Sequence, residues 1–194
     1  MNKILIALAA LAALACAPKA PHNTWTAEEK ALIEAPDSIM RVLLVTGRED
    51  SIILRTPCDT LTREMLSSED YIILAQKMLS TVQSPQQGGV GIAGPQVGIS
   101  RRIVAVKRYD KPERPFEVYP NARITAFRGQ KELGPEGCLS VPDRRGNVPR
   151  YRDIDITYST PRGDTTESVQ GYSAIIFQHE CDHLDGVLYT DYLD

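Results

Sequence analysis

The chain has 194 residues, a formal net charge of −3 and 42% hydrophobic residues. A chain of this length can bury one hydrophobic core but is too short for two typical domains. Because no block of basic residues accompanies the negative charge, the composition argues against nucleic acid as the main partner, and we expect none.

The first residues have the layout of an export signal. Lys3 precedes an apolar run over residues 4–15 that is too short to span a bilayer as a mature helix. Residues 13–16 fit either an A-x-A cleavage site or an imperfect lipoprotein box in which Cys16 becomes lipidated, and an apolar helix packed on the domain is a third interpretation. We expect export to the cell envelope, with membrane anchoring at Cys16 under the lipoprotein interpretation and a cytoplasmic location as the alternative.

A polar extension follows the leader, and the regular elements begin after it. Residues 71–82 are predicted to form a helix, and Ser67 with Asp70 loosely resembles a helix-starting box before Tyr71. Residues 102–107 and 154–158 are the clearest strands. One helix, several short strands and a second helix near the end indicate the α+β class.

The stretch GVGIAGPQ over residues 89–96 contains the G-x-G-x-x-G pattern of dinucleotide-binding folds. That fold requires a strand just before the glycines and a helix that opens at the third one. Here a predicted helix and a loop precede them, and Pro95 disfavours helical geometry at Gly94. We therefore interpret the glycines as a close backbone approach to a ligand, with Gln96 offering an amide donor.

Cys138 lies in the segment EGCLS. A thiolate is a strong ligand for borderline metals, and Gly137 permits the tight backbone path that would aim it inward. A small buried hydrophobic residue is the other interpretation, because most free cysteines are of that kind. The segment alone leaves both open.

The segment QHECDH carries two of the three histidines, His179 and His183. Residues four apart project from one face of a helix, so both imidazoles can meet one metal ion. Glu180 lies about 100° further round the helix and is free to act as a general base beside a metal-activated water. A chance match in a polar helix is the alternative. The apolar run before the motif predicts a buried helix, and Asp185 with Gly186 is a stop signal.

Together, the three segments resemble the peptide deformylases. That family carries G-x-G-x-A-A-x-Q, E-G-C-x-S and Q-H-E-x-D-H in this order, and here Gly94 replaces the usual second alanine. The resemblance covers residues 53–192. It implies mixed or antiparallel short sheets packed around a central metal-binding helix. We therefore expect a catalytic domain over residues 53–194, preceded by the leader over residues 1–16 and an extension over residues 17–52.

The resemblance also implies the roles of the site residues. One divalent metal ion is bound by Cys138, His179 and His183. Fe²⁺ is the usual ion of the family, with Zn²⁺ or Ni²⁺ as alternatives, and we expect zinc to be favoured in an exported protein because zinc has no redox chemistry. Two side chains, Glu136 and Asp182, are expected to orient the ligands.

The implied reaction is hydrolysis of the N-formyl group of N-formylmethionyl peptides, with release of formate. The implied catalytic groups are the Glu180 carboxylate, the Gln96 amide and the Leu139 N–H. The peptide backbone would pair with an extended segment, and the methionine side chain would enter an apolar slot. The residues implied for substrate binding are Gly89, Val90, Gly91, Arg145, Ile175 and Ile176.

Two other function classes remain open at this point. An H-E-x-x-H metallopeptidase would use the last segment alone, and a non-catalytic lipoprotein would keep the fold as a binding module. We expect a monomer. A disulfide between Cys58 and Cys181 would require the two residues to lie close, which the sequence does not show.

Overall fold

The computed structural model describes residues 22–193. Its helices are α1 (Ala27–Glu34), α2 (Arg48–Leu54), α3 (Arg63–Leu66), α4 (Glu69–Gln83) and α5 (Gly171–Leu184), with the 3₁₀ turns η1 (Gly94–Val97) and η2 (Tyr189–Tyr192). Its strands are β1 (Gly91–Ala93), β2 (Ile103–Lys107), β3 (Phe116–Pro120), β4 (Arg123–Cys138), β5 (Val141–Thr160) and β6 (Gly163–Gln170). The leader and Cys16 lie outside the described residues.

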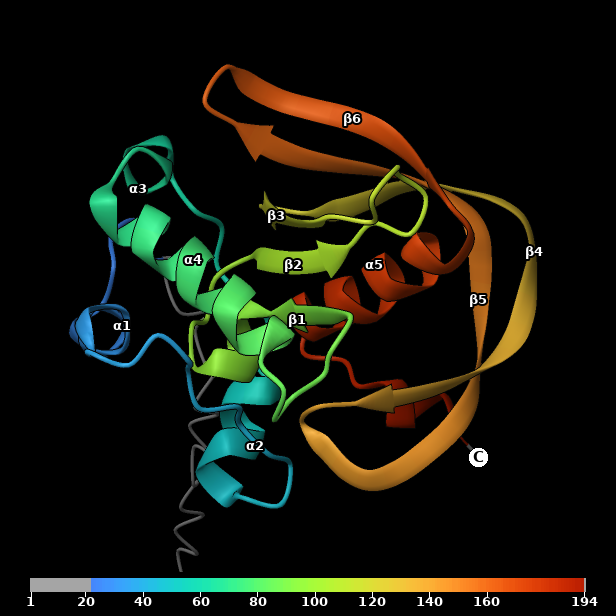
Figure 1. Cartoon of the computed structure of the whole chain (residues 1–194), viewed down its shortest axis with the longest axis horizontal. Coiled ribbons are helices and arrows are strands. Elements are labelled where there is room, and N and C mark those ends of the chain that lie inside the picture. Colours follow the sequence, from blue (N-terminus) through green and yellow to red (C-terminus); the bar gives the residue numbers. More distant parts are fainter. Residues whose placement is uncertain (1–21, 194) are drawn as a thin grey trace, which may run out of the picture.

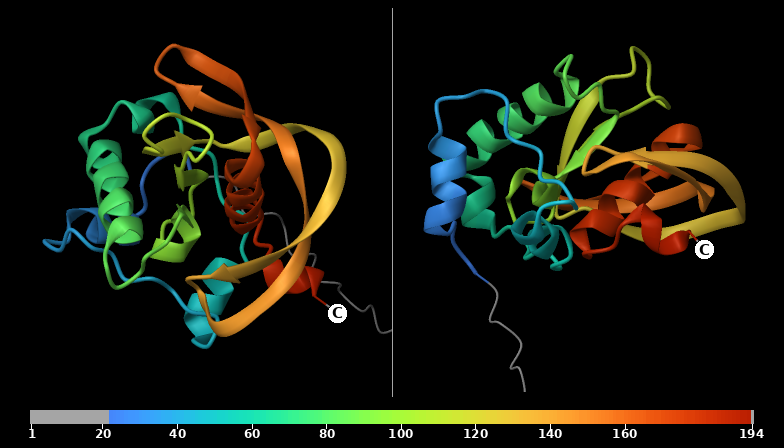
Figure 2. Two further views of the ribbon diagram at one scale, coloured as in Figure 1. Left: turned by 45° about the vertical axis from the view of Figure 1, so that its right-hand side comes forward. Right: turned by 90° about the horizontal axis from the view of Figure 1, so that it is seen from below.

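Two antiparallel sheets, ordered β1-β2-β3 and β4-β5-β6, enclose α5 (Figure 1). Successive residues of β2 explain this arrangement, because Ile103 packs in the core with α4 whereas Val104 packs in the core with α5. Figure 2 shows from other directions that α1 and α4 lie on the far side of the first sheet from α5. The predicted α+β fold around a central helix is confirmed.

The second sheet is built from two long strands that curve around α5. The strand predicted over residues 154–158 lies in the second half of β5, which has 20 residues. The sequence hid its first half because Pro142, Gly146 and Pro149 are poor strand residues. Register shifts at three points along the β4–β5 ladder bend the pair.

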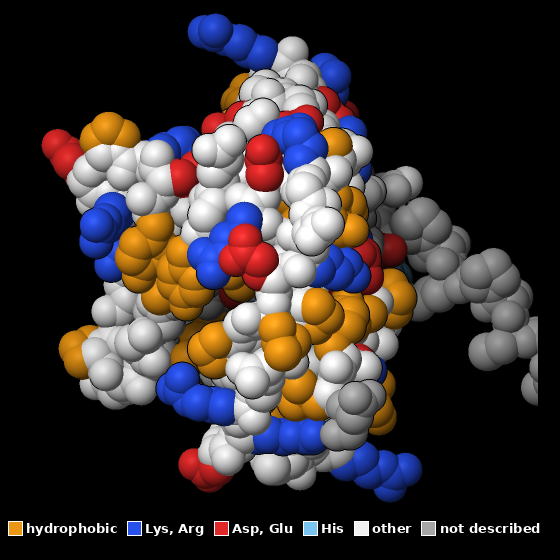
Figure 3. All heavy atoms as spheres, turned by 90° about the vertical axis from the view of Figure 1, so that its right-hand side faces the viewer, with side chains coloured by type: hydrophobic (Ala, Val, Ile, Leu, Met, Phe, Trp, Pro, Cys, Tyr) orange, Lys and Arg blue, Asp and Glu red, His pale blue; other side chains and the backbone are white. Residues whose placement is uncertain are grey.

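The outer face of this sheet is partly apolar. Hydrophobic side chains gather there between lysine and arginine side chains (Figure 3), and Phe127 and Leu133 of β4 are 52% and 69% exposed. Among the residues that the structure describes, none of the helices combines the length and the apolar character that crossing a bilayer requires.

The helix α4 begins one residue later than the predicted box. Its N-cap is Ser68, whose hydroxyl accepts a hydrogen bond from the Tyr71 N–H. The box at Ser67 was therefore wrong by one position, because the Ser67 N–H bonds to carbonyls of α3 and ends that helix. The stop signal after α5 is confirmed, since Gly186 has a φ of 73° and a Cβ there would lie 2.5 Å from the Arg55 carbonyl oxygen.

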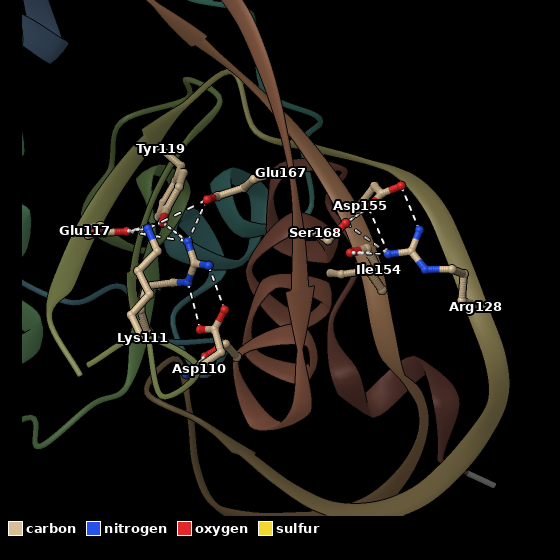
Figure 4. Close-up of polar contacts among 11 residues, drawn as sticks. Asp110, Lys111, Glu117, Tyr119, Arg128, Ile154, Asp155, Glu167 and Ser168 are labelled. Carbon is tan, nitrogen blue, oxygen red and sulfur yellow. Dashed lines mark hydrogen bonds and ion pairs between the residues drawn. The ribbon is translucent and has the colours of Figure 1, made fainter. Parts of the chain in front are cut away.

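A buried ionic cluster holds the loop after β2 against the second sheet. The guanidinium of Arg108, which is 1% exposed, bonds to the carboxylates of Asp110 and Glu167 and to the hydroxyl of Tyr119. Figure 4 shows the side chains of Asp110, Tyr119 and Glu167 converging with those of Glu117 and Lys111. Buried charges are tolerated when they are paired in this way.

Candidate active site

The helix α5 and the end of β4 bring three metal-binding side chains together. The ligand atoms of Cys138, His179 and His183 lie within 4.8 Å of one another. The Cys138 Sγ and the His183 Nε2 are 3.2 Å apart, and both histidines project from one face of α5 with ring centroids 5.0 Å apart. The predicted ligand set therefore forms one cluster.

The chemistry of this cluster fits a borderline divalent metal ion. A thiolate with two imidazoles is a donor set that suits zinc and iron. Burial lowers the pKa of His183, which favours the neutral imidazole that a metal requires. The Nδ1 of His179 is 2.8 Å from the Glu136 carboxylate, so its Nε2 is left for the cluster.

A chain of buried charges stands behind the ligands. Glu136, which holds His179, receives hydrogen bonds from the Arg150 guanidinium at 2.7 and 3.2 Å. Arg150 also donates to Asp182 at 2.7 Å and is 5% exposed. The sequence correctly singled out both acids but gave Arg150 no role. The sequence did contain a signal for Arg150, because two acidic side chains that are expected beside a buried helix require a basic side chain nearby.

Glu180 lies at the bottom of the site with few polar neighbours. It is 3% exposed, and among the described residues its Oε2 has no hydrogen-bond partner. Burial raises the pKa of Glu180 to about 7, which suits a group that accepts and returns a proton near neutral pH. A Cβ on Gly91 would lie 2.9 Å from the Glu180 Cδ and 2.7 Å from the Ile176 Cγ2, so this close approach requires glycine.

The amide of Gln96 has a fixed orientation. Its Oε1 accepts the Ala93 N–H at 2.8 Å, so its Nε2 faces the Ser140 hydroxyl at 3.2 Å and the Cys138 Sγ at 3.4 Å. The loop that carries it is tightly packed at Gly94, where a Cβ would lie 2.6 Å from the Arg101 carbonyl oxygen. The glycine that departs from the family pattern is therefore required by this packing.

A cleft of about 750 Å³ lies between β1, α5 and the β4–β5 turn, and its lining includes Cys138 and His179. Every residue predicted to bind substrate lines it, as do the Gln96, Leu139 and Glu180 predicted for catalysis. Other lining residues were missed because they carry no motif, and four of them have polar or aromatic side chains. These are Gln87, Asp143, Arg144 and Tyr172.

The family model for polypeptide deformylase matches residues 41–194. The chain belongs to the peptide deformylase family. It is 36% identical over 149 residues to a peptide deformylase of Leptospira biflexa. The matched region covers 73% of this chain and 82% of that protein. It is also 42% identical over 133 residues to peptide deformylase 2 of Bordetella bronchiseptica. That match covers 65% of this chain and 74% of the Bordetella protein.

Solved structures agree with this assignment. The class I type b peptide deformylase of Acinetobacter baumannii with Met-Ala-Ser bound is 36% identical, with a TM-score of 0.70 over 80% of this chain and 98% of that one. The same enzyme with actinonin bound has a TM-score of 0.70 at 34% identity over 80% and 99%. A peptide deformylase of Thermotoga maritima has a TM-score of 0.69 at 30% identity over 80% and 98%. The resemblance stated from the three motifs is confirmed, whereas neither the metallopeptidase nor the non-catalytic alternative is favoured.

Proposed function

We propose that this protein hydrolyses the N-formyl group of N-formylmethionyl peptides and releases formate. The observation that carries the proposal is that the cluster of Cys138, His179 and His183 adjoins a cleft, which Cys138 and His179 line together with Glu180 and Gln96. The names of its relatives support the same reaction.

Peptide binding is supported by the position of β1. Within residues 22–193 this strand pairs only with β2, so its other edge is available for main-chain hydrogen bonds. Gly89, Val90 and Gly91 line the cleft along this edge. A peptide that added a strand here would be recognised by its backbone, which accommodates many sequences.

The methionine side chain is assigned to the apolar wall that α5 presents. Ile175 and Ile176 line the cleft from α5, and Tyr172 lies one turn earlier on the same helix. An apolar slot beside the reacting carbonyl would place the methionine and fix the formyl group over Glu180 and Gln96.

In the proposed reaction, a divalent metal ion held by Cys138, His179 and His183 supplies Lewis-acid activation. Glu180 accepts a proton from the attacking water and returns it to the nitrogen that leaves as the free amine. The amide of Gln96 and the N–H of Leu139 stabilise the negative oxygen that develops on the formyl carbon. Water and formamide thus become formate and amine.

The identity of the metal is part of the proposal. We infer Fe²⁺ from the family resemblance, with Zn²⁺ or Ni²⁺ as alternatives and zinc favoured if the protein is exported. Elemental analysis of protein purified without added metal tests this. A predominance of iron would support Fe²⁺ and would contradict the preference for zinc that export implies.

We also propose that the protein works in the cell envelope, anchored through a lipid on Cys16. The support is the charged and apolar layout of residues 1–16. Fractionation after labelling with a palmitate analogue would detect the anchor, and unlabelled protein in the cytoplasmic fraction would contradict it. We expect a monomer that binds no nucleic acid, which gel filtration and a DNA-binding assay can test.

The reaction itself is tested with formyl-Met-Ala-Ser and its acetyl counterpart. We expect formate and free amine from the formyl peptide alone, and loss of both products in Glu180→Ala protein that still contains one metal ion. Cleavage of an internal peptide bond would indicate a metallopeptidase instead. No product from metal-loaded protein would indicate a binding module.

A further inference from the structure

Two arginine side chains at the mouth of the cleft have no acidic partner among the described residues. Arg144 and Arg145 are exposed, line the cleft and lie near the start of β5, shortly after the turn from β4. Other arginines of β5 are paired, since Arg150 bonds to Glu136 and Arg152 bonds to Glu132. The two guanidinium groups at the mouth are therefore available to a ligand.

The backbone under these side chains is firmly held. The Tyr189 hydroxyl donates a hydrogen bond of 2.6 Å to the Arg144 carbonyl oxygen. Arg145 pairs with Gly137 in the ladder, and its Cγ and Cζ lie 3.6 and 3.9 Å from the point where a Gly137 Cβ would stand. The Arg145 side chain thus lies across the glycine that precedes Cys138, at the edge of the reaction site.

The other charges that line the cleft leave the mouth positive. Glu136 is paired with Arg150, and Glu180 is buried at the bottom. Asp143 is exposed beside the two arginines and opposes them. Two guanidinium groups against one carboxylate give a local positive charge, although the whole protein carries a net charge of −3. Such a local excess attracts anions to a cleft.

We propose that Arg144 and Arg145 select formyl peptides that carry a carboxylate close to the formylmethionine, either an acidic side chain or the free C-terminus of a short peptide. The proposal rests on the proposed deformylase function. Because Arg145 stands opposite the residue next to Cys138, the carboxylate must lie within a few residues of the formyl group. Arginine suits this role because its planar group binds carboxylates through two parallel hydrogen bonds.

Two matched pairs of peptides test the preference and separate the two sources of carboxylate. Formyl-Met-Ala-Ser with a free C-terminus is compared with its amide, and formyl-Met-Ala-Asp-amide with formyl-Met-Ala-Asn-amide. We expect the carboxylate peptide of at least one pair to have a kcat/KM about three- to tenfold higher at low salt. The ratio should fall at high salt, because exposed charges are screened.

Variants that are expected to change the kcat/KM ratio in opposite directions make the test specific. Arg144→Gln and Arg145→Gln should each lower the ratio of kcat/KM between the carboxylate peptide and its uncharged counterpart. Asp143→Asn should raise this ratio. Arg162→Gln, at the exposed turn between β5 and β6, is the control, since it removes the same charge far from the cleft along β5.

Ratios near one in both pairs, with formate released from every peptide, would overturn the carboxylate preference and leave the deformylase function standing. An equal fall of the ratio in the Arg162→Gln protein would overturn the local role of Arg144 and Arg145. Absence of formate from all four peptides would overturn the proposed function, and this inference with it.

Discussion

Gly91 shows how one missing side chain shapes the reaction site. The edge strand that would receive the peptide and the carboxylate that would move the proton meet at this residue, with no room for a methyl group between them. The glycine that superficially matched a nucleotide-binding pattern therefore lets β1 and Glu180 approach each other.

We expect Gly91→Ala to lower kcat/KM on the order of 100-fold, because the added Cβ displaces either Glu180 or the strand from its position. Steady-state kinetics on a formyl peptide measures the effect. Gly134→Ala is a matched control, since a Cβ there meets nothing within 4 Å. Equal activity of the two variants would contradict the close approach.

Arg150 is the second residue with a strong expected effect. Replacement by methionine leaves the Glu136 carboxylate buried without its cation, and breaking such a pair destabilises a fold by ~3–5 kcal/mol. We expect a loss of stability toward the lower end of this range, because Asp182 is partly exposed. We also expect the variant to contain less metal. Urea denaturation and elemental analysis measure both.

The control for this variant is Arg152→Met. Its partner Glu132 is 60% exposed, so the loss should be about 1 kcal/mol or less. If both variants lost the same stability, the buried ion pair of Arg150 would contribute no more to the fold than an exposed one.

The two kinds of site residue differ in how far the sequence could predict them. The histidines could be found because helical geometry relates residues four apart, and Cys138 followed from the family motif. The role of Arg150 could not be predicted locally, because its partners lie 14 and 32 positions away and meet it only after β5 has paired with β4 and packed on α5.

At the scale of elements, the N-terminal extension is joined to the site. The guanidinium of Arg101, 0% exposed, bonds to both oxygens of Glu29 in α1. Further along, the Leu43 N–H donates to the Gln96 carbonyl at 2.8 Å, and the Val45 N–H donates to the Ser140 carbonyl at 2.9 Å. The segment after α1 thus contacts both loops that form the site.

Glu29→Gln should destabilise the protein by about 3 kcal/mol, because Arg101 would remain buried without a countercharge. Thermal unfolding followed by circular dichroism measures the change. Glu34→Gln in the same helix is exposed and should change stability by less than about 0.5 kcal/mol. A melting temperature for Glu29→Gln equal to that of the control would show that α1 is not held through this pair.

The helices α1 and α2 were not predicted, because the sequence around them is mostly polar and each is short. Their stability comes from contacts with the rest of the chain rather than from a strong apolar pattern of their own. For α1, the decisive contacts are the Arg101 pair and the Lys77 ammonium, which donates to the Leu32 and Ala35 carbonyls at the end of the helix.

At the scale of the whole molecule, the described part of the chain is folded without a disulfide. Cys58 and Cys181, considered as a pair from sequence, are both free thiols. Burial raises the pKa of each to about 12. The fold therefore keeps both thiols neutral at ordinary pH.

We expect neither Cys58 nor Cys181 to react with a thiol reagent at pH 8 until the protein is unfolded. Because the unfolded thiols ionise near their ordinary pKa of about 8.5 while the folded ones stay neutral to about 12, the free energy of unfolding should fall as the pH rises between these values. Denaturation at pH 8 and pH 10 measures this, with Cys58→Ala as the comparison, which should lose less stability. Rapid labelling of the native protein would contradict the burial of these thiols.

The position of α5 between the two sheets has a thermodynamic consequence. An ion held by His179 and His183 of this helix and Cys138 of β4 would tie the centre of the molecule to its outer sheet, so it would bind the folded state far more tightly than the unfolded chain. Each tenfold rise of free metal above the dissociation constant then adds ~1.4 kcal/mol to the free energy of unfolding. The melting temperature, titrated with one ion at a time, would rank the ions by affinity without any peptide.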